Sequence, residues 1–456
     1  MNNIYQLLPE YLQNIFVTLK NVQVYYNKYG VIPFFNSISK VQKNILANEK
    51  VMVNYNVKMI ANFVQYCVAN VPYFIKKKNI YNISIKQISD FEKLPIVSKA
   101  ELKKNIEQFY SKKIAIINYT KFQTSGTTGN PMIGFIRKRD LQKRFRIILK
   151  TMCESGFDLN SPYARFLGKD IAKKGKVYRK DILHNHYFFS IFRISQENIL
   201  KYYNALIEHK IKFIEGYPST INNLVNMFRR NNLVIENIKV VMVTAEKLNI
   251  YQRENIEDYF GCKVFDYYGS TEQSVYIYKP TTSNTYFVSN LTGYIEVIKE
   301  DGTLARKGEE GQILITSFTS HFTPLVRYEI GDRCVVKDIL KLEDGSLQYE
   351  ISEIIGRNEE SFATKDGRIV SRFSLVLKFL PYMVKAAQLF LSERNNVILV
   401  KYIAEKQIPA SDFDSFVKKM NYFVGLGYFY KFTKVEELES TKSGKVRTVF
   451  IEKNEK

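Results

Sequence analysis

Apolar residues in the first 115 positions recur mainly at helical spacing. At the N-terminus this spacing predicts a helix within residues 1–20. Its apolar face would carry Leu7, Leu8, Leu12, Ile15 and Phe16. Further along, Ser98 precedes a helix-like stretch at 99–109, and Glu101 completes a capping-box pattern. The opening quarter of the chain is therefore expected to be helical.

From residue 113 the apolar runs become short and rich in β-branched residues. Ile114–Tyr119 and Met132–Ile136 each predict a strand, so the Ser/Thr/Gly-rich segment between them joins two strands and does not open a helix. Between 195 and 260, strands and helices are expected to alternate. This alternation predicts a parallel or mixed sheet with helices on its faces. The expected helices span 196–209, 218–229 and 252–260, and the expected strands span 212–217, 239–244 and 263–267.

The pattern changes again in the last third of the chain. Short alternating runs within 286–340, broken by DG, GEEG and GD turns, predict an antiparallel β subdomain. Beyond a boundary near 356–360, smaller elements suffice for a compact unit of about 100 residues. The predicted fold is α/β. Residues 1–357 would form a large domain of mixed sheets flanked by helices, with the β subdomain, and residues 358–456 a small, mobile C-terminal α+β domain.

The composition excludes general disorder but leaves two explanations of the net charge open. The chain has 456 residues, of which 45% are hydrophobic, so sizeable cores are possible and general disorder is excluded. The formal net charge is +22. A nucleic acid, an anionic membrane surface or an anionic substrate would account for it, but so would a background rich in Lys, Asn, Ile and Tyr. The basic residues are spread along the chain, which favours the background; the local run at 169–180 suits either a phosphate-bearing substrate or a solvated loop.

Cysteines and hydropathy indicate the compartment. The four cysteines lie far apart and form no CxxC pair, which argues against a disulfide framework or a zinc site. No apolar run reaches about 18 residues, and the N-terminus lacks a signal-peptide pattern. A cytoplasmic protein without a membrane span is expected.

The segment Thr124–Pro131 (TSGTTGNP) is rich in groups that bind phosphate. Its glycines let backbone N–H groups turn toward an anion, and its hydroxyls add donors. It is not a P-loop, because no Lys-Ser or Lys-Thr closes it and a strand follows. By itself it fits a triphosphate site and a flexible hairpin equally well.

Four further motifs follow it, each of which alone is compatible with an ordinary turn. The sequence DYYGSTE at 266–272 offers an aromatic ring beside a glycine, suited to adenine, and a carboxylate suited to Mg²⁺. RYEIGD at 327–332 ends in a carboxylate that can accept from ribose hydroxyls, and IGR at 355–357 supplies a guanidinium. TKSGKVR at 441–447 holds a lysine that can neutralise charge developing during adenylation.

In this order the five motifs resemble those of the adenylate-forming superfamily, which includes acyl-CoA ligases, peptide adenylation domains and luciferases. LPIVSK at 94–99 with Leu102 is similar to the phenylacetate–CoA ligase branch. Within that branch the chain looks most like CapK-type proteins of bacterial surface-polysaccharide gene clusters. That closer likeness rests on EGYPS at 215–219, QRE at 252–254, FGC at 260–262 and TKDGR at 364–368. The resemblance extends from about residue 70 to 450.

The resemblance implies a nucleotide site assembled from these motifs. The β- and γ-phosphates would be held by Thr124, Ser125, Gly126, Thr127, Thr128 and Gly129. Adenine would lie against the backbone at Glu246 and stack on Tyr268 beside Gly269, with Asp266 accepting from its amino group. The hinge position, Asp or Lys in the family, is Glu359 here.

The resemblance also implies the catalytic set. Thr271 would meet the α-phosphate, Glu272 would bind Mg²⁺, and Asp332 would hold the ribose. Arg357 would contact ribose or phosphate, and Lys445 would be the adenylation lysine.

The expected activity is ATP- and Mg²⁺-dependent conversion of a small carboxylic acid to its acyl-adenylate, with release of pyrophosphate. The acyl group would pass to CoA, or to an amine or hydroxyl in surface-polysaccharide biosynthesis. The segment 184–195 would line the carboxylate pocket, with His184 and His186 either acid/base groups or positional or solvated ones. No nucleic-acid partner is expected, and a homodimer is compatible with the sequence. The alternative is a degenerate adenylation scaffold that binds nucleic acid or another anionic polymer, against which the intact Glu272, Asp332, Arg357 and Lys445 argue.

Overall fold

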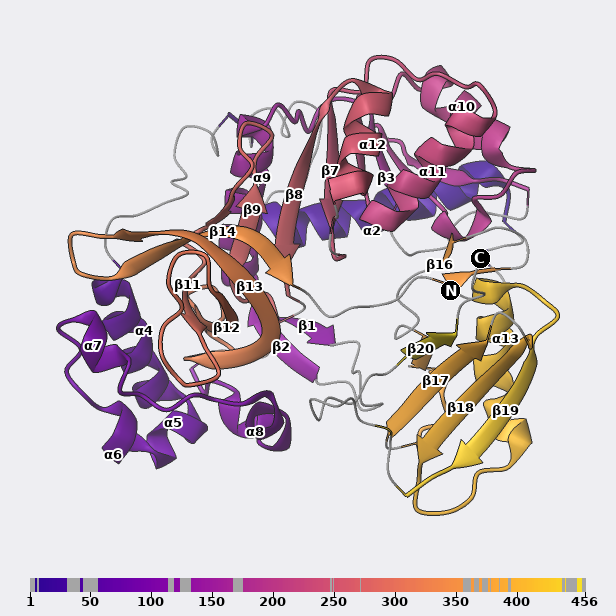
Figure 1. Ribbon diagram of the computed structural model, residues 1–456. Coiled ribbons are helices and arrows are strands. Elements are labelled where there is room, and N and C mark those ends of the chain that lie inside the picture. The colour runs from indigo at the N-terminus through magenta and orange to yellow at the C-terminus, as the bar shows by residue number, and fades with distance from the viewer. Residues whose placement is uncertain are drawn as a thin grey trace.

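The computed structural model describes a defined set of residues. These are residues 5, 8–30, 42–43, 56–113, 119–123, 133–166, 175–246, 248, 250–270, 272–355, 362–364, 369–370, 376–377, 379–384, 386–392, 395–436, 439 and 449–452. They form a mixed α/β structure (Figure 1), as the sequence predicts.

Twelve of the described strands form one sheet, in the order β11-β12-β13-β14-β10-β9-β8-β7-β6-β3-β5-β4. Strands β5, β3, β6, β7 and β8 pair in parallel, whereas β9 to β14 pair antiparallel. The expected β subdomain is therefore hydrogen-bonded into the same sheet as the parallel strands. The bounds are β3 Tyr163–Phe166, β4 Tyr178–Asp181, β5 His186–Phe189, β6 Phe213–Gly216, β7 Val240–Thr244, β8 Lys263–Gly269, β9 Tyr276–Lys279, β10 Tyr286–Val288, β11 Gly293–Ile298, β12 Glu310–Ser317, β13 Tyr328–Lys341 and β14 Leu347–Ile355.

Helices cover both faces of the parallel half, because side chains along each strand alternate between the faces. Val241 and Val243 of β7 pack toward α10, α11 and α12, while Val240 and Met242 pack toward α2 and α9. Figure 1 shows α10, α11 and α12 in front of these strands and α2 behind them. The bounds are α2 Glu10–Tyr29, α9 Lys138–Glu154, α10 Ile199–Glu208, α11 Pro218–Arg230 and α12 Ile250–Phe260.

The antiparallel half packs against the short helices that open the chain. One continuous core joins side chains from 60–109 with side chains from 275–354. The helices are α4 Val57–Asn70, α5 Pro72–Lys76, α6 Lys78–Tyr81, α7 Ile88–Phe91 and α8 Lys99–Lys104. Helix α8 begins as expected, because Ser98 Oγ accepts a hydrogen bond of 3.1 Å from the backbone N–H of Glu101.

Two smaller sheets complete the described structure. Strands β1 (Tyr119–Gln123) and β2 (Ile133–Arg137) pair antiparallel, so strands do flank the Thr124–Pro131 segment on both sides. Near the C-terminus a sheet in the order β19-β18-β17-β20 packs against α13 (Asp414–Val424) around its own core. Its strands are β17 Ala386–Ser392, β18 Val397–Ile403, β19 Phe429–Lys434 and β20 Val449–Glu452, and a short pair is formed by β15 Phe362–Ala363 and β16 Ile369–Val370.

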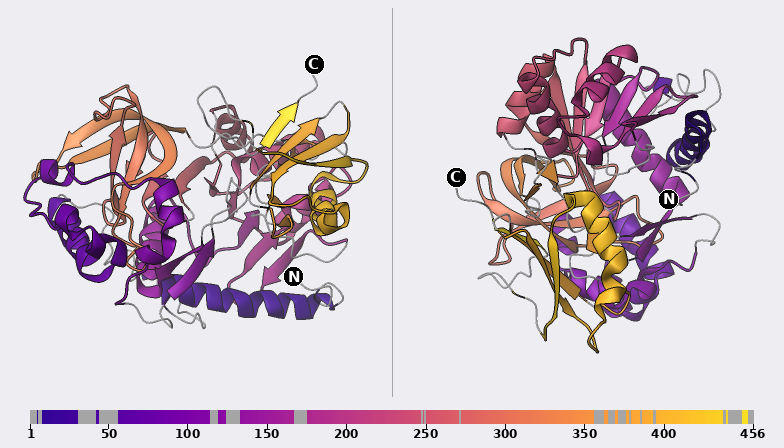
Figure 2. Two further views of the ribbon diagram at one scale, coloured as in Figure 1. Left: turned by 90° about the horizontal axis from the view of Figure 1, so that it is seen from below. Right: turned by 90° about the vertical axis from the view of Figure 1, so that its right-hand side faces the viewer.

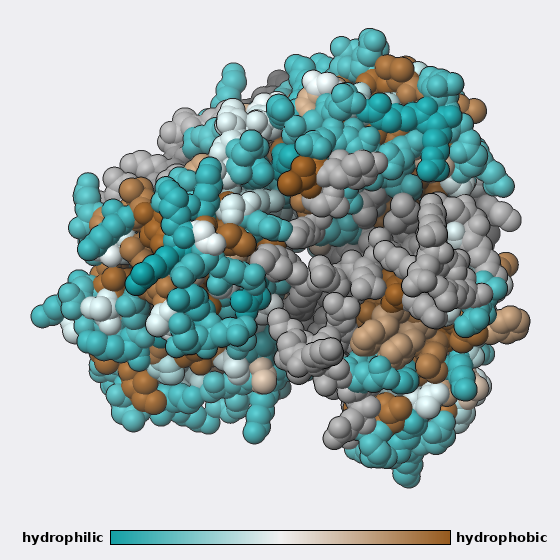
Figure 3. Space-filling model, in the orientation of Figure 1, coloured by the Kyte–Doolittle hydropathy of each residue, from teal (hydrophilic) through white to brown (hydrophobic). Residues whose placement is uncertain are grey.

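Figure 2 turns the molecule to show the position of α2. In both views this helix runs along the outside of the parallel half, on the side away from the viewer of Figure 1. The face drawn in Figure 3 is predominantly hydrophilic, with apolar side chains in scattered groups. Among the described residues, no helix has the length and apolar character needed to cross a membrane.

Candidate active site

Three residues of the predicted nucleotide site, Glu246, Tyr268 and Asp332, lie at or beside the carboxyl ends of β7 and β8, where the sheet changes from parallel to antiparallel. Glu246 lies two residues beyond the end of β7, and Tyr268 and Gly269 end β8. The two strand ends are tied together by the Thr244 hydroxyl, which donates to the Tyr267 carbonyl oxygen at 2.9 Å. Such a change of direction at the carboxyl ends of parallel strands is a common place for a ligand site.

Tyr268 and Asp332 come from motifs that are 64 residues apart, and the fold brings them into direct contact. The Tyr268 hydroxyl donates to Asp332 Oδ2 at 2.6 Å. Both side chains are partly exposed, so a ligand can reach the ring and the carboxylate. One group suited to adenine and one suited to ribose hydroxyls thus lie side by side.

Glu272 lies three residues beyond the end of β8, and its side chain is only 5% exposed. Its Oε1 is 3.9 Å from Nζ of Lys99, at the start of α8. A buried carboxylate oxygen is a suitable ligand for Mg²⁺, because this cation prefers hard oxygen donors. In the sequence Lys99 belongs only to the LPIVSK motif, and the fold places it beside Glu272.

Backbone conformations at this site are unusual for the residues that adopt them. Ala245 and Gln273 have φ angles of 71° and 54°, in the left-handed region that non-glycine residues seldom occupy. Each flanks a predicted site carboxylate, Glu246 or Glu272. Such conformations cost about 1–3 kcal/mol and concentrate at functional sites.

Asp266 is more enclosed than its expected role implies. Its carboxylate accepts a hydrogen bond from Tyr286 and lies 3.7 Å from Arg253 Nη2. Burial raises the pKa of Asp266 from 3.8 to about 6, although Tyr286 and Arg253 act in the opposite direction. Contact between this side chain and adenine stays a prediction.

Arg144, on α9, supports the segment that carries Glu272. Its guanidinium is buried, and Nη1 donates to the Ser274 carbonyl oxygen at 2.9 Å. Burial lowers the pKa of Arg144 to about 10. A Cβ at Gly269 would lie 3.1 Å from Arg144 Nη2, so a glycine there gives the guanidinium room. Nothing in the sequence pattern distinguishes Arg144 from a solvated helix residue.

A buried polar cluster lies beneath β8. Glu215, on β6, accepts hydrogen bonds from Tyr163, from Arg165 Nε at 2.6 Å and from the Tyr267 hydroxyl at 2.8 Å. Burial alone would raise the pKa of Glu215, but the Arg165 charge and these hydrogen bonds outweigh it and bring the pKa to about 2. The cluster fixes Tyr267, the neighbour of Tyr268.

His184 and His186 are buried between β5 and α2 and bonded within the protein. Burial lowers the pKa of His186 to about 3, so its ring is neutral. Its Nε2 donates to the Leu159 carbonyl oxygen at 3.2 Å, and its Nδ1 accepts from the Tyr25 hydroxyl at 2.9 Å. His184 Nδ1 bonds to Asp181. Of the two roles left open, these contacts support the positional one.

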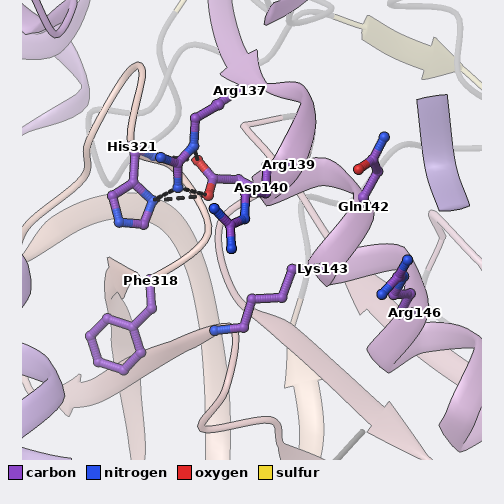
Figure 4. Close-up of a pocket in the computed structure, with 8 residues that line it drawn as sticks. All are labelled: Arg137, Arg139, Asp140, Gln142, Lys143, Arg146, Phe318 and His321. Carbon is purple, nitrogen blue, oxygen red and sulfur yellow. Dashed lines mark hydrogen bonds and ion pairs between the residues drawn. The ribbon is translucent and has the colours of Figure 1, made fainter. Parts of the chain in front are cut away.

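A basic pocket of ≈ 550 Å³ opens at the start of α9 (Figure 4). It is lined by Arg137, Arg139, Asp140, Gln142, Lys143, Arg146, Phe318 and His321. Asp140 is buried and holds Arg137 and His321 through bonds of 2.6 Å and 3.0 Å. The single carboxylate of the pocket is thus already paired, and the lining carries a surplus of positive charge.

Several predicted site residues lie outside the described residues. These are the loop Thr124–Pro131, Thr271, Arg357, the hinge residue Glu359 and the lysine Lys445. The described residues include no group of three His, Cys, Asp or Glu side chains arranged to hold a metal ion.

Comparison with curated proteins gives a full-length relative. Protein CapK of Staphylococcus aureus is 23% identical over 464 aligned positions, which cover 98% of each chain. Phenylacetate–coenzyme A ligase of Escherichia coli is 22% identical and covers 65% of this chain and 69% of its own. Along its full length this chain resembles members of the adenylate-forming superfamily. It is thus related to AMP-forming ligases, in the branch that its motifs predicted.

A further curated protein is similar over a shorter part of the chain. Indoleacetate–lysine synthetase of Pseudomonas savastanoi is 29% identical over 182 positions, 35% of this chain and 43% of its own. No protein-family model matches the chain.

A solved structure of 2-hydroxyisobutyryl-CoA ligase, in complex with 2-HIB-AMP and CoA, has the same fold as this chain. The TM-score is 0.57, with 16% identity over 91% of this chain and 90% of the other. A second structure of that ligase, in an open conformation, gives a TM-score of 0.53 and covers 90% of this chain and 92% of the other.

Proposed function

We propose that this chain uses ATP to convert a small carboxylic acid to its acyl-adenylate, and then transfers the acyl group to a nucleophilic acceptor. The observation that carries the proposal is the hydrogen bond between Tyr268, near the end of β8, and Asp332, in β13, with Glu272 three residues beyond the end of β8. The full-length relationship to CapK and the similarity to phenylacetate–CoA ligase support it.

The described residues suggest how the nucleotide is held. The Tyr268 ring offers a stacking surface for adenine, and its hydroxyl orients the Asp332 carboxylate toward ribose hydroxyls. Arg144 and Lys99 hold the segment around Glu272 from two sides. Mg²⁺ bound at Glu272 would neutralise phosphate charge as pyrophosphate leaves.

The first step forms a bond between a substrate carboxylate oxygen and the α-phosphorus of ATP. The bond between the α-phosphorus and the bridging oxygen breaks, and pyrophosphate leaves with that electron pair. Lys445 would stabilise the charge that develops, as an ammonium group aimed at the reacting oxygens. In the second step the acceptor attacks the acyl carbon and AMP leaves.

Two acceptor classes remain in the proposal. The structure of 2-hydroxyisobutyryl-CoA ligase contains CoA, and the name of indoleacetate–lysine synthetase points to an amine. The relationship to CapK favours an amine or hydroxyl of a surface polysaccharide or its precursor.

ATP–pyrophosphate exchange in the presence of a panel of carboxylic acids tests the first step. We expect at least one acid to support exchange, and Lys445→Ala to abolish it while ATP still binds. Lys442→Ala, in the same motif, is the matched control and should retain exchange. Absence of exchange with every acid of a broad panel would contradict the proposal. Product analysis with CoA and with amino sugars then separates the acceptor classes.

A further inference from the structure

Helix α2 is amphipathic in the opposite sense to an ordinary surface helix. Surface helices normally bury their apolar stripe and expose their polar one. The residues that α2 buries are Gln13, Val17, Thr18, Asn21 and Tyr25. The residues that it exposes include Tyr11, Ile15, Phe16, Leu19 and Tyr26, with Tyr11 and Leu19 each 64% exposed. The described part of the chain thus leaves an apolar stripe uncovered over most of this helix.

Hydrogen bonds hold the polar face inward. Gln13 Oε1 accepts from Arg179 Nε, and the Thr18 hydroxyl accepts from the backbone N–H of Ile182 at 2.9 Å. Asn21 donates to Asp181, and the Tyr25 hydroxyl bonds His186. Rolling the apolar stripe toward the core would break all of these bonds and leave buried polar groups without partners, at about 1–3 kcal/mol each. The outward orientation is therefore fixed by the fold.

The stripe continues beyond the helix. Ile182 and Leu183, in the β4–β5 turn, are 54% and 41% exposed, and the Ile182–Thr18 bond places them beside α2. We name the surface formed by Tyr11, Ile15, Phe16, Leu19, Tyr26, Ile182 and Leu183 the α2 surface. Helix α2, which carries most of this surface, lies on the side of the molecule away from the viewer of Figure 3 (Figure 2).

The C-terminal end of α2 adjoins the basic pocket. Gln142 donates to the Tyr26 carbonyl oxygen at 3.3 Å, and Arg146 donates to the Tyr29 carbonyl oxygen at 3.2 Å. Arg139, Gln142, Lys143 and Arg146 recur at helical spacing, so they share one face of α9 (Figure 4). Lys20 is an exposed residue of α2 next to Leu19, and Lys176 is paired with Glu10 at the start of the helix. An apolar strip is therefore bordered by cationic groups.

We propose that the chain docks on the surface of an anionic membrane, with α2 lying in the plane of the interface and lipid phosphates entering the basic pocket. An apolar helix face with basic residues beside it is what interfacial binding requires. Charge decides between this occupant and a second copy of the chain. Two copies meeting at the α2 surface would bring like charges together on chains of net charge +22, whereas anionic lipid neutralises them.

Vesicle co-sedimentation of the full chain tests the proposal. The probes are vesicles of phosphatidylcholine alone and of equal parts of phosphatidylcholine and phosphatidylglycerol. We expect binding to the mixed vesicles and at least tenfold weaker binding to phosphatidylcholine, because each basic residue near an anionic surface contributes about fivefold in affinity. Ile15→Ser with Leu19→Ser, and separately Arg139→Glu with Lys143→Glu, should each weaken binding to the mixed vesicles at least tenfold.

Matched controls change the same chemistry elsewhere. Leu200→Ser with Leu340→Ser removes two exposed leucines, and Lys406→Glu with Lys418→Glu reverses two exposed charges. Both should bind as the wild type does. All variants should keep the wild-type circular dichroism spectrum and melting temperature, because only surface side chains change.

Three results would overturn the proposal. The first is no binding to the mixed vesicles. The second is equal loss of binding in the α2 and control variants. The third is a dimer by light scattering that Ile15→Ser with Leu19→Ser dissociates, without vesicle binding. If the chain binds no vesicles but its basic pocket binds inorganic phosphate, the first of these results holds and the pocket belongs to a soluble ligand. The readout is independent of adenylation, so failure here leaves the proposed function standing.

Discussion

Replacing Glu215 by Gln tests the buried cluster beneath β8. The substitution keeps the size of the side chain but removes the charge that faces Arg165. The guanidinium then remains buried without its counter-ion, and the tyrosine hydroxyls lose a charged acceptor. We expect a cost of about 3 kcal/mol in the free energy of unfolding at pH 7, in line with breaking a buried pair.

The pKa of Glu215 gives that expectation a pH dependence. The carboxyl has a pKa of about 2 in the folded chain against an ordinary 4.5, so ionisation favours the folded state. A lowered carboxyl pKa supplies stability above pH 4.5, and this stability is lost as the pH falls toward 2. The contribution is therefore about 3 kcal/mol at pH 7 and about 1 kcal/mol at pH 3.

Urea unfolding of the wild type and Glu215→Gln, at several pH values from 7 to 3, measures this difference. The gap between the two proteins should shrink by about 2 kcal/mol over that range. Glu236→Gln changes an exposed carboxyl and is the matched control, with no gap expected at any pH. A gap for Glu215→Gln that stays constant down to pH 3 would refute the assigned charge and its pairing with Arg165.

Three further predictions concern the site. Tyr268→Phe keeps the ring but removes the hydrogen bond to Asp332, so KM for ATP in the exchange assay should rise about threefold to tenfold; an unchanged KM would separate this pair from ATP binding. Arg144→Met removes the donor to the Ser274 carbonyl, and kcat should fall at least tenfold with a smaller change in KM, whereas an effect confined to stability would make Arg144 purely structural. The raised pKa of Asp266 makes its ionisation unfavourable in the folded chain, so the Asp266→Asn variant should become more stable than the wild type, by up to about 3 kcal/mol, as the pH rises from 4 through 6. Urea unfolding of both proteins at pH 4 and pH 7 measures this difference in stability. A difference of equal size at both pH values would contradict the prediction.

Local pattern was sufficient to predict most of the parallel half. The strand at 239–244 appears as β7, Val240–Thr244, with residues 240–243 buried. The helix at 252–260 appears as α12, Ile250–Phe260, which buries Ile256 and Phe260 and exposes Glu254 and Asp258. The order of five motifs predicts a nucleotide site, which stays a prediction, and the fold brings Tyr268 and Asp332, from two of these motifs, into contact.

What the sequence could not supply depends on long-range pairing. The antiparallel strands looked like an appended subdomain, since nothing in a local run reveals that β9 pairs with β8 on one side and β10 on the other. Arg144 and Arg179 look like solvated residues, yet both are buried and bonded to groups over 100 positions away. The periodicity within residues 1–20 predicted a helix, and α2 spans Glu10–Tyr29. Its inner face is set by Asp181 and His186, which no local pattern connects to it.

The core that joins residues 60–109 to residues 275–354 sets the order in which the chain can fold during synthesis. The helices α4 to α8 leave the ribosome early, but the strands that cover their apolar faces are completed some 250 residues later. At typical elongation rates of 5–20 residues per second, these faces stay uncovered for roughly 12 to 50 s. Nascent chains that stop between residues 110 and 350 should therefore need a holding chaperone to stay in solution. The rest of the sheet offers no substitute partner, because its parallel half buries its own faces under α2, α9 and α10–α12.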